Sequence, residues 1–96
     1  MSEKKQQKQI KIKLDEETAM GKYSNIGTVS HTPEEFIVDY LFLPPGSDQA
    51  KVISRIITSP GHAKRLFSAL KDNIEKYEKK FGKIMPSEGK GNKIGF

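Results

Sequence analysis

The chain has 96 residues, enough for one domain at most, and so small a domain buries only a modest part of its surface and often relies on a partner. It contains no cysteine, which excludes a disulfide framework, a thiolate zinc site and a thiol nucleophile. The first residues lack the apolar stretch of a signal peptide, and no run reaches membrane-span length. We therefore expect a cytoplasmic protein that has no membrane contact.

The formal net charge of +5 comes from the two ends of the chain. Residues 1–13 hold five lysines and one acid, residues 84–96 hold two lysines and one acid, and residues 14–83 hold ten bases and ten acids. Nucleic-acid-binding domains usually gather basic residues on a folded face, so we predict that residues 1–8 form a disordered basic arm. The alternative is weak, non-specific binding of nucleic acid through Lys4, Lys5, Lys8, Lys11 and Lys13.

Four segments have the composition of β-strands. Residues 9–17 alternate apolar and polar side chains, which predicts a strand with one wet face, and its lysines suit a sheet edge. Residues 22–31 predict a weaker strand, in which Asn25 and Gly27 suggest a bulge. Residues 35–43 and 50–58 carry apolar side chains at both odd and even positions, so a strand formed by either segment is apolar on both faces. A loop that contains proline and glycine separates the two segments.

A long helix follows the last predicted strand. Ser59 is a candidate N-cap and Pro60 suits the first helical position. Apolar residues then recur every three or four positions up to Phe81, and Gly82 ends the pattern. The sequence therefore predicts an α+β fold of order β-β-β-β-α, with an antiparallel sheet of about four strands and the helix packed on one face. Residues 9–83 form the single domain, and residues 84–96 a flexible tail.

The loop between the third and fourth predicted strands suggests a hairpin in which Asp39 lies opposite Arg55. Opposite charges are favourable directly across a ladder, and a slip of one residue would separate them. In this register one face of the hairpin carries Phe36, Val38, Tyr40, Phe42, Val52 and Ile56. The other face carries Ile37, Leu41, Leu43, Ile53 and Ile57 around the Asp39–Arg55 pair.

One helix can cover only one of these two apolar faces. The other would expose more apolar surface than soluble monomers usually tolerate. We therefore expect the chain to bind a second copy through this face or an adjoining edge, as a homodimer or a higher even-numbered oligomer. The alternative is a different protein partner. The interface would consist of Ile37, Asp39, Leu41, Leu43, Ile53, Arg55 and Ile57.

Signals for chemistry are weak throughout the chain. His31 stands near Glu34 and Glu35, which could suggest a metal site, but turn histidines are common and nothing else indicates one. His62, with Lys64 and Arg65, lies at the predicted helix start, where an anion could bind, although every helix has such an end. No phosphate-binding glycine loop or nucleophile motif is present. We predict that the protein is not an enzyme and uses no cofactor or metal.

Three stretches of the sequence resemble a known family: YSN at 23–25, HTPEEFIVDYLFLPPG at 31–46 and RIITSPGHAKRLFSALKDNIEKYEKKFG at 55–82. The resemblance is to the domain of unknown function 3467 family of short, uncharacterised bacterial and archaeal proteins, and it covers about residues 21–82. It implies no activity, ligand or catalytic residue. The order of sheet and helix is also similar to that of oligomeric export chaperones of the SecB kind, an analogy of architecture alone. We therefore expect a self-associating, chaperone- or adaptor-like interaction module.

Overall fold

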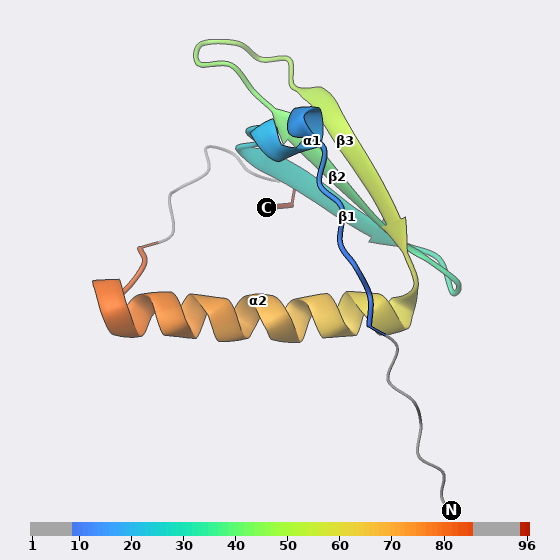
Figure 1. Ribbon diagram of the computed structural model, residues 1–96. Helices are drawn as coiled ribbons and strands as arrows, with labels where there is room; N and C mark the ends of the chain where they lie inside the picture. The colour runs from blue at the N-terminus through green and yellow to red at the C-terminus, as the bar shows by residue number, and fades with distance from the viewer. Residues whose placement is uncertain (1–8, 86–94) are drawn as a thin grey trace, which may run out of the picture.

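A computed structural model describes residues 9–85 and 95–96 of the chain (Figure 1). The fold is α+β, as the sequence predicts. Its elements in chain order are α1 (Glu16–Met20), β1 (Ile26–His31), β2 (Phe36–Phe42), β3 (Lys51–Thr58) and α2 (Pro60–Phe81).

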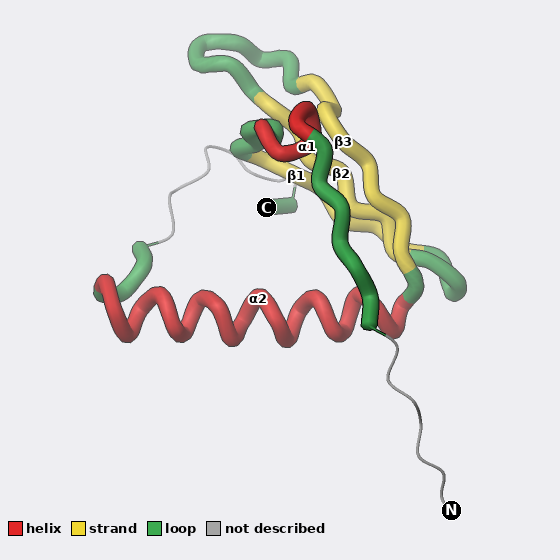
Figure 2. The backbone as a smooth tube through the Cα atoms, in the orientation of Figure 1, coloured by secondary structure: helices red, strands yellow, loops and turns green. Residues whose placement is uncertain are grey.

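The sheet has three antiparallel strands in the order β1-β2-β3, so each strand pairs with its neighbour in the chain (Figure 2). These are three of the four predicted strands. In the second connection Ser47 donates its backbone N–H to the carbonyl of Pro44 at 3.1 Å, and Gly46 adopts a positive φ of 81°. The prolines and this glycine therefore form the expected turn between two strands that pair directly.

The prediction of a strand over residues 9–17 is wrong. Residues 9–15 form a loop, and α1 begins at Glu16. Asp15 caps this helix by accepting a hydrogen bond from the backbone N–H of Thr18 at 3.3 Å, and two acids follow in the first turn, where the helix dipole favours them. Residues 9–14 alternate apolar and polar side chains, but they form no strand because no described strand pairs with them. Their apolar side chains, Ile10, Ile12 and Leu14, are exposed.

The helix α2 forms as predicted, with the expected caps. The Ser59 hydroxyl accepts from the backbone N–H of His62 at 3.1 Å, and Pro60 occupies the first turn. The hydroxyl of Thr58, the last residue of β3, lies 2.7 Å from Nδ1 of His62. Gly82 ends the helix with a φ of 105° and donates its N–H to Glu78 at 3.0 Å. A single residue, Ser59, thus connects β3 to α2.

The predicted packing of α2 on the sheet is wrong for the single chain. The helix leaves the end of β3 and diverges from the sheet, so that the two elements form an open wedge (Figure 1). No residue of α2 is buried. The one-residue connection and the caps around it set this direction, and the apolar side of the helix has no partner among the described residues. This apolar stripe consists of Leu66, Phe67, Leu70, Ile74, Tyr77 and Phe81, all exposed.

The two predicted terminal segments fall largely outside the described residues, which exclude 1–8 and 86–94. Within the predicted tail, Ile84 donates its backbone N–H to the Glu78 carboxylate at 3.0 Å. At the C-terminus, Phe96 forms backbone hydrogen bonds with Gly27 of β1. These contacts place both described parts of the tail against the folded elements.

Candidate functional site

The ion pair between Asp39 and Arg55 lies at the centre of the sheet. The two residues are cross-strand partners on β2 and β3, which confirms the predicted pairing. Nε of Arg55 donates to Oδ1 of Asp39 at 2.7 Å, and Nη2 donates to Oδ2 at 2.8 Å. This two-point geometry matches the planar guanidinium to the planar carboxylate and is among the stronger side-chain interactions in proteins.

The two partners differ sharply in exposure. Asp39 is 8% exposed, whereas the Arg55 side chain is 60% exposed. The hydrogen bond from Arg55 is the main cause that lowers the pKa of Asp39, and the same bond raises the pKa of Arg55. The carboxylate therefore stays ionised at neutral pH. One side of the guanidinium remains accessible to another molecule.

A bulge shifts the hairpin register beyond the ion pair. The predicted partners hold from Phe36 to Tyr40, but Leu41 then pairs with Val52, and Ile53 is the extra residue on β3. Because paired residues share a face, Val52 joins Leu41 on the face of the ion pair. The predicted placement of Ile53 on that face is wrong, since Ile53 lines a hollow together with Tyr40 on the other side of the sheet.

The face that carries Asp39 is called the ion-pair face from here on. It comprises Ile37, Asp39, Leu41, Leu43, Val52, Arg55 and Ile57. Ile37, Leu41 and Leu43 are half-buried, while Ile57 is 53% exposed. Leu43 follows the end of β2, and Asn25 holds its backbone through two hydrogen bonds, at 2.9 and 3.0 Å. Six of the seven predicted interface residues thus lie on this face, and Val52 replaces the seventh.

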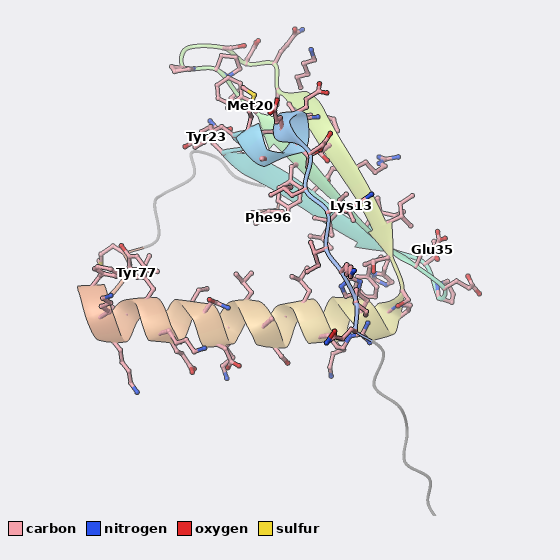
Figure 3. All side chains as sticks on the ribbon, viewed as in Figure 1. Lys13, Met20, Tyr23, Glu35, Tyr77 and Phe96 are labelled. Atoms are coloured by element: carbon pink, nitrogen blue, oxygen red, sulfur yellow. The ribbon has the colours of Figure 1, made fainter. Side chains whose placement is uncertain are left out.

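The opposite face, called the Tyr40 face, carries most of the aromatic contacts of the sheet. His31 stacks on Phe36 with the ring centroids 5.3 Å apart. Tyr23 meets Phe42 edge-on at 6.2 Å, and the labelled rings of Tyr23 and Phe96 lie near the sheet in Figure 3. These contacts are partial, since Tyr40 remains 37% exposed and Ile56 53% exposed.

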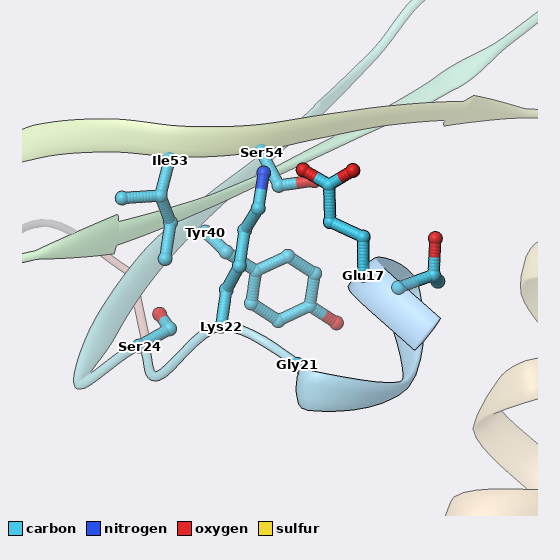
Figure 4. Close-up of a pocket in the computed structure, with 8 residues that line it drawn as sticks. Glu17, Gly21, Lys22, Ser24, Tyr40, Ile53 and Ser54 are labelled. Atoms are coloured by element: carbon cyan, nitrogen blue, oxygen red, sulfur yellow. The ribbon is translucent and has the colours of Figure 1, made fainter. Parts of the chain in front are cut away.

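The hollow lined by Tyr40 and Ile53 also contains polar groups (Figure 4). Glu17 and Lys22 extend over it from α1 and from the loop that follows, and Ser54 lies across from them. Its volume of about 610 Å³ falls within the range of ligand pockets.

The histidines have local roles. His31 contacts Phe36, and the adjacent turn is held by the Thr32 hydroxyl, which accepts backbone N–H groups from Glu34 and Glu35 at 3.1 Å each. No group of three or more possible metal ligands occurs within residues 9–85 and 95–96. His62 contacts Thr58 at the helix start.

Of the five lysines of the predicted nucleic-acid site, Lys11 and Lys13 are exposed on the loop before α1. Lys4, Lys5 and Lys8 lie outside the described residues. In the described part of the chain, neither helix is both long and apolar enough to cross a membrane.

The protein family with the description "Protein of unknown function (DUF3467)" matches residues 1–86. The chain belongs to the DUF3467 family. The match extends beyond the segments that carry the resemblance in sequence and includes the basic N-terminal residues and α1. No curated protein and no solved structure matches this DUF3467 member.

Proposed function

We propose that this DUF3467 member is a self-associating protein-interaction module that works as a homodimer or a higher even-numbered oligomer. One observation carries the proposal: no apolar side chain within residues 9–85 and 95–96 is buried, and the only buried side chain that is charged or polar is Asp39. Hydrophobic burial is the main force that offsets the entropy lost on folding. A chain with this arrangement gains its core by contact with another surface.

The exposed apolar surface is large enough to form an interface. The six side chains of the apolar stripe on α2 are 41% to 65% exposed, which leaves on the order of 600 Å² of them open to water if each spans roughly 200 Å². Monomers rarely expose more than a few hundred Å² in one patch. Together with the ion-pair face, the stripe approaches the ~800 Å² per partner that is typical of a stable complex.

A second copy is the occupant that this geometry favours. The wedge between α2 and the sheet offers an apolar helix and an apolar sheet in the same chain (Figure 1). Two copies related by a two-fold axis can each place the apolar stripe on a sheet of the other, so that both kinds of surface are covered at once. The accessible side of Arg55 would then help to set the orientation of the copies.

In this proposal the protein is an adaptor or a chaperone-like factor rather than an enzyme. It acts in the cytoplasm, which the lack of cysteine favours. A different protein could take the place of the second copy on the same surfaces.

Light scattering at micromolar concentration tests the proposal directly, and we expect a mass of two or more chains. Ile57→Glu should shift the protein toward the monomer, because it places a charge on an exposed part of the ion-pair face. Met20→Glu is the matched control, since Met20 is 84% exposed on α1 and outside that face. A strictly monomeric wild type would refute the proposal, and so would an Ile57→Glu assembly identical to that of Met20→Glu.

A second candidate function is non-specific nucleic-acid binding by the basic arm. It is supported by the concentration of positive charge in residues 1–13 and by the exposure of Lys11 and Lys13. Binding of DNA or RNA should weaken as salt is raised and should disappear when residues 1–8 are deleted. Binding that survives this deletion, or no binding at low salt, would remove this candidate.

A further inference from the structure

The outer edge of β1 is occupied by Gly95-Phe96. β1 is an edge strand, with β2 on its inner side only. Gly27 donates its backbone N–H to the backbone oxygen of Phe96 at 2.7 Å, and Phe96 donates its N–H to the carbonyl of Gly27 at 3.0 Å. Such a mutual exchange is the hydrogen-bonded pair of an antiparallel ladder. The last residue therefore adds a rung to the sheet.

The Phe96 side chain is received by a complementary surface. Its ring lies over Gly27 and meets the Tyr40 ring edge-on, at 5.9 Å between centroids and an interplanar angle of 84°. A Cβ atom at Gly27 would overlap the Phe96 ring and would come within 2.8 Å of the Asp39 backbone oxygen. Glycine is thus the residue that leaves room for the ring. Phe96 nevertheless stays 53% exposed, so the contact is open to exchange.

The edge also has room for a longer peptide. Outward-facing backbone groups recur every second residue along an antiparallel strand, so Val29 points its N–H and C=O away from β2 as Gly27 does. No described residue forms a backbone hydrogen bond to these groups of Val29. Lys22 lines the same hollow as Phe96, together with Tyr23 and Asn25, and supplies a positive charge there.

We propose that the β1 edge at Gly27 is a binding site for an extended peptide segment that contains Gly-Phe. The segment adds a strand to the sheet, its backbone pairs with Gly27 and Val29, and its phenylalanine ring sits against Gly27 and Tyr40. The occupant is Gly95-Phe96 of this chain. This site differs from the ion-pair face and the apolar stripe, and it stands even if the protein proves to be a monomer.

A labelled peptide tests the site in the full-length protein. The probe is Lys-Ile-Gly-Phe with an N-terminal fluorophore and a free carboxylate, measured by fluorescence anisotropy. Phe96→Ala should bind it at least about tenfold more tightly than the wild type, whose own Gly95-Phe96 competes at the high effective concentration of a linked ligand. Met85→Ala is the matched control, because Met85 is an 80% exposed apolar residue outside this site, the ion-pair face and the apolar stripe, and it should behave as the wild type does. A peptide that ends in alanine should bind about tenfold more weakly than the probe, a difference of ~1.4 kcal/mol.

Amide hydrogen exchange at Gly27 provides a second readout. The Gly27 amide should be protected in the wild type, exposed in Phe96→Ala, and protected again when the probe is added. A Phe96→Ala protein with an unchanged circular dichroism spectrum that fails to bind the probe would overturn the proposal. Equal binding of the Phe and Ala peptides would overturn it as well. Protection in the wild type that is independent of concentration indicates binding within one chain, and protection that grows with concentration indicates exchange between copies; both support the site.

Discussion

Phe67 lies within the apolar stripe of α2 and allows a quantitative test of self-association. Its side chain is 65% exposed in the single chain. An aromatic residue spans roughly 200 Å², so a second copy would remove about 130 Å² of this side chain from water, worth about 3 kcal/mol at ~25 cal/mol per Å². Alanine retains part of that contact, and a two-fold dimer contains the residue twice. Phe67→Ala should therefore weaken the dimer by about 4 kcal/mol, close to a thousandfold in Kd.

Sedimentation equilibrium across a range of concentrations measures this change. Lys76→Ala is the control, because Lys76 lies nine residues from Phe67, about two and a half helical turns, and thus on the opposite side of α2. If the ring is simply exposed to solvent, its removal should alter stability by no more than about 0.5 kcal/mol. A Phe67→Ala protein with the same Kd as Lys76→Ala would refute the assignment of the apolar stripe to an interface.

Two further predictions concern stability, measured as the free energy of unfolding in urea. The pKa of Asp39 is lowered by its hydrogen bond from Arg55. The ion pair therefore stabilises the folded state fully above the pKa of an unfolded aspartate, about 3.9. This contribution is lost as the pH falls through the lower pKa of the folded state. Below about pH 4 the wild type should lose more stability than Asp39→Asn. The pKa of Asp15 is also lowered, but Asp15 is present in both proteins and cancels in the comparison. Equal losses would contradict the role of the ion pair. Ser59→Ala should cost about 1 kcal/mol because the cap of α2 is lost, whereas Ser68→Ala within the helix should not destabilise; equal effects would argue against the cap.

The hairpin shows how far sequence reasoning reaches. One acid and one base, each alone among apolar residues, were sufficient to predict that Asp39 pairs with Arg55, and the structure confirms this pairing. An unbroken ladder would put Ile53 on the ion-pair face, and the bulge puts it on the Tyr40 face. The signal for the bulge is weak, since Val52 and Ile53 are similar in size and polarity and either could face inward.

The helix was predictable from local signals, but its packing was not. Ser59, Pro60 and Gly82 mark the two ends of α2 through hydrogen bonds and dihedral preferences that act within a few residues. An apolar stripe indicates only that something covers the helix, and the partner can belong to another chain. The same holds for Ile10 and Ile12, whose alternation lacks a strand to pair with in the single chain.

Phe96 is a contact that sequence patterns did not indicate. The last residues are rich in glycine and show no periodicity, so residues 84–96 were expected to form a flexible tail. An aromatic residue at the very end, together with a lone Gly27 within a predicted strand, was the available signal. Glycine inside a strand often marks a close approach by other atoms, and here the approaching group is the Phe96 ring.

Only Ser59 separates β3 from α2, so the direction of the apolar side of the helix depends on the length of this connection. Each residue inserted after Thr58 would rotate α2 by about 100° around its axis, and one insertion would turn the apolar stripe of Leu66 and Phe67 well away from its present direction. Substitutions along α2 would change its affinity for a partner. A change of length at Ser59 would change the position that the partner has to occupy. The length of this connection therefore decides which way the apolar stripe of α2 faces.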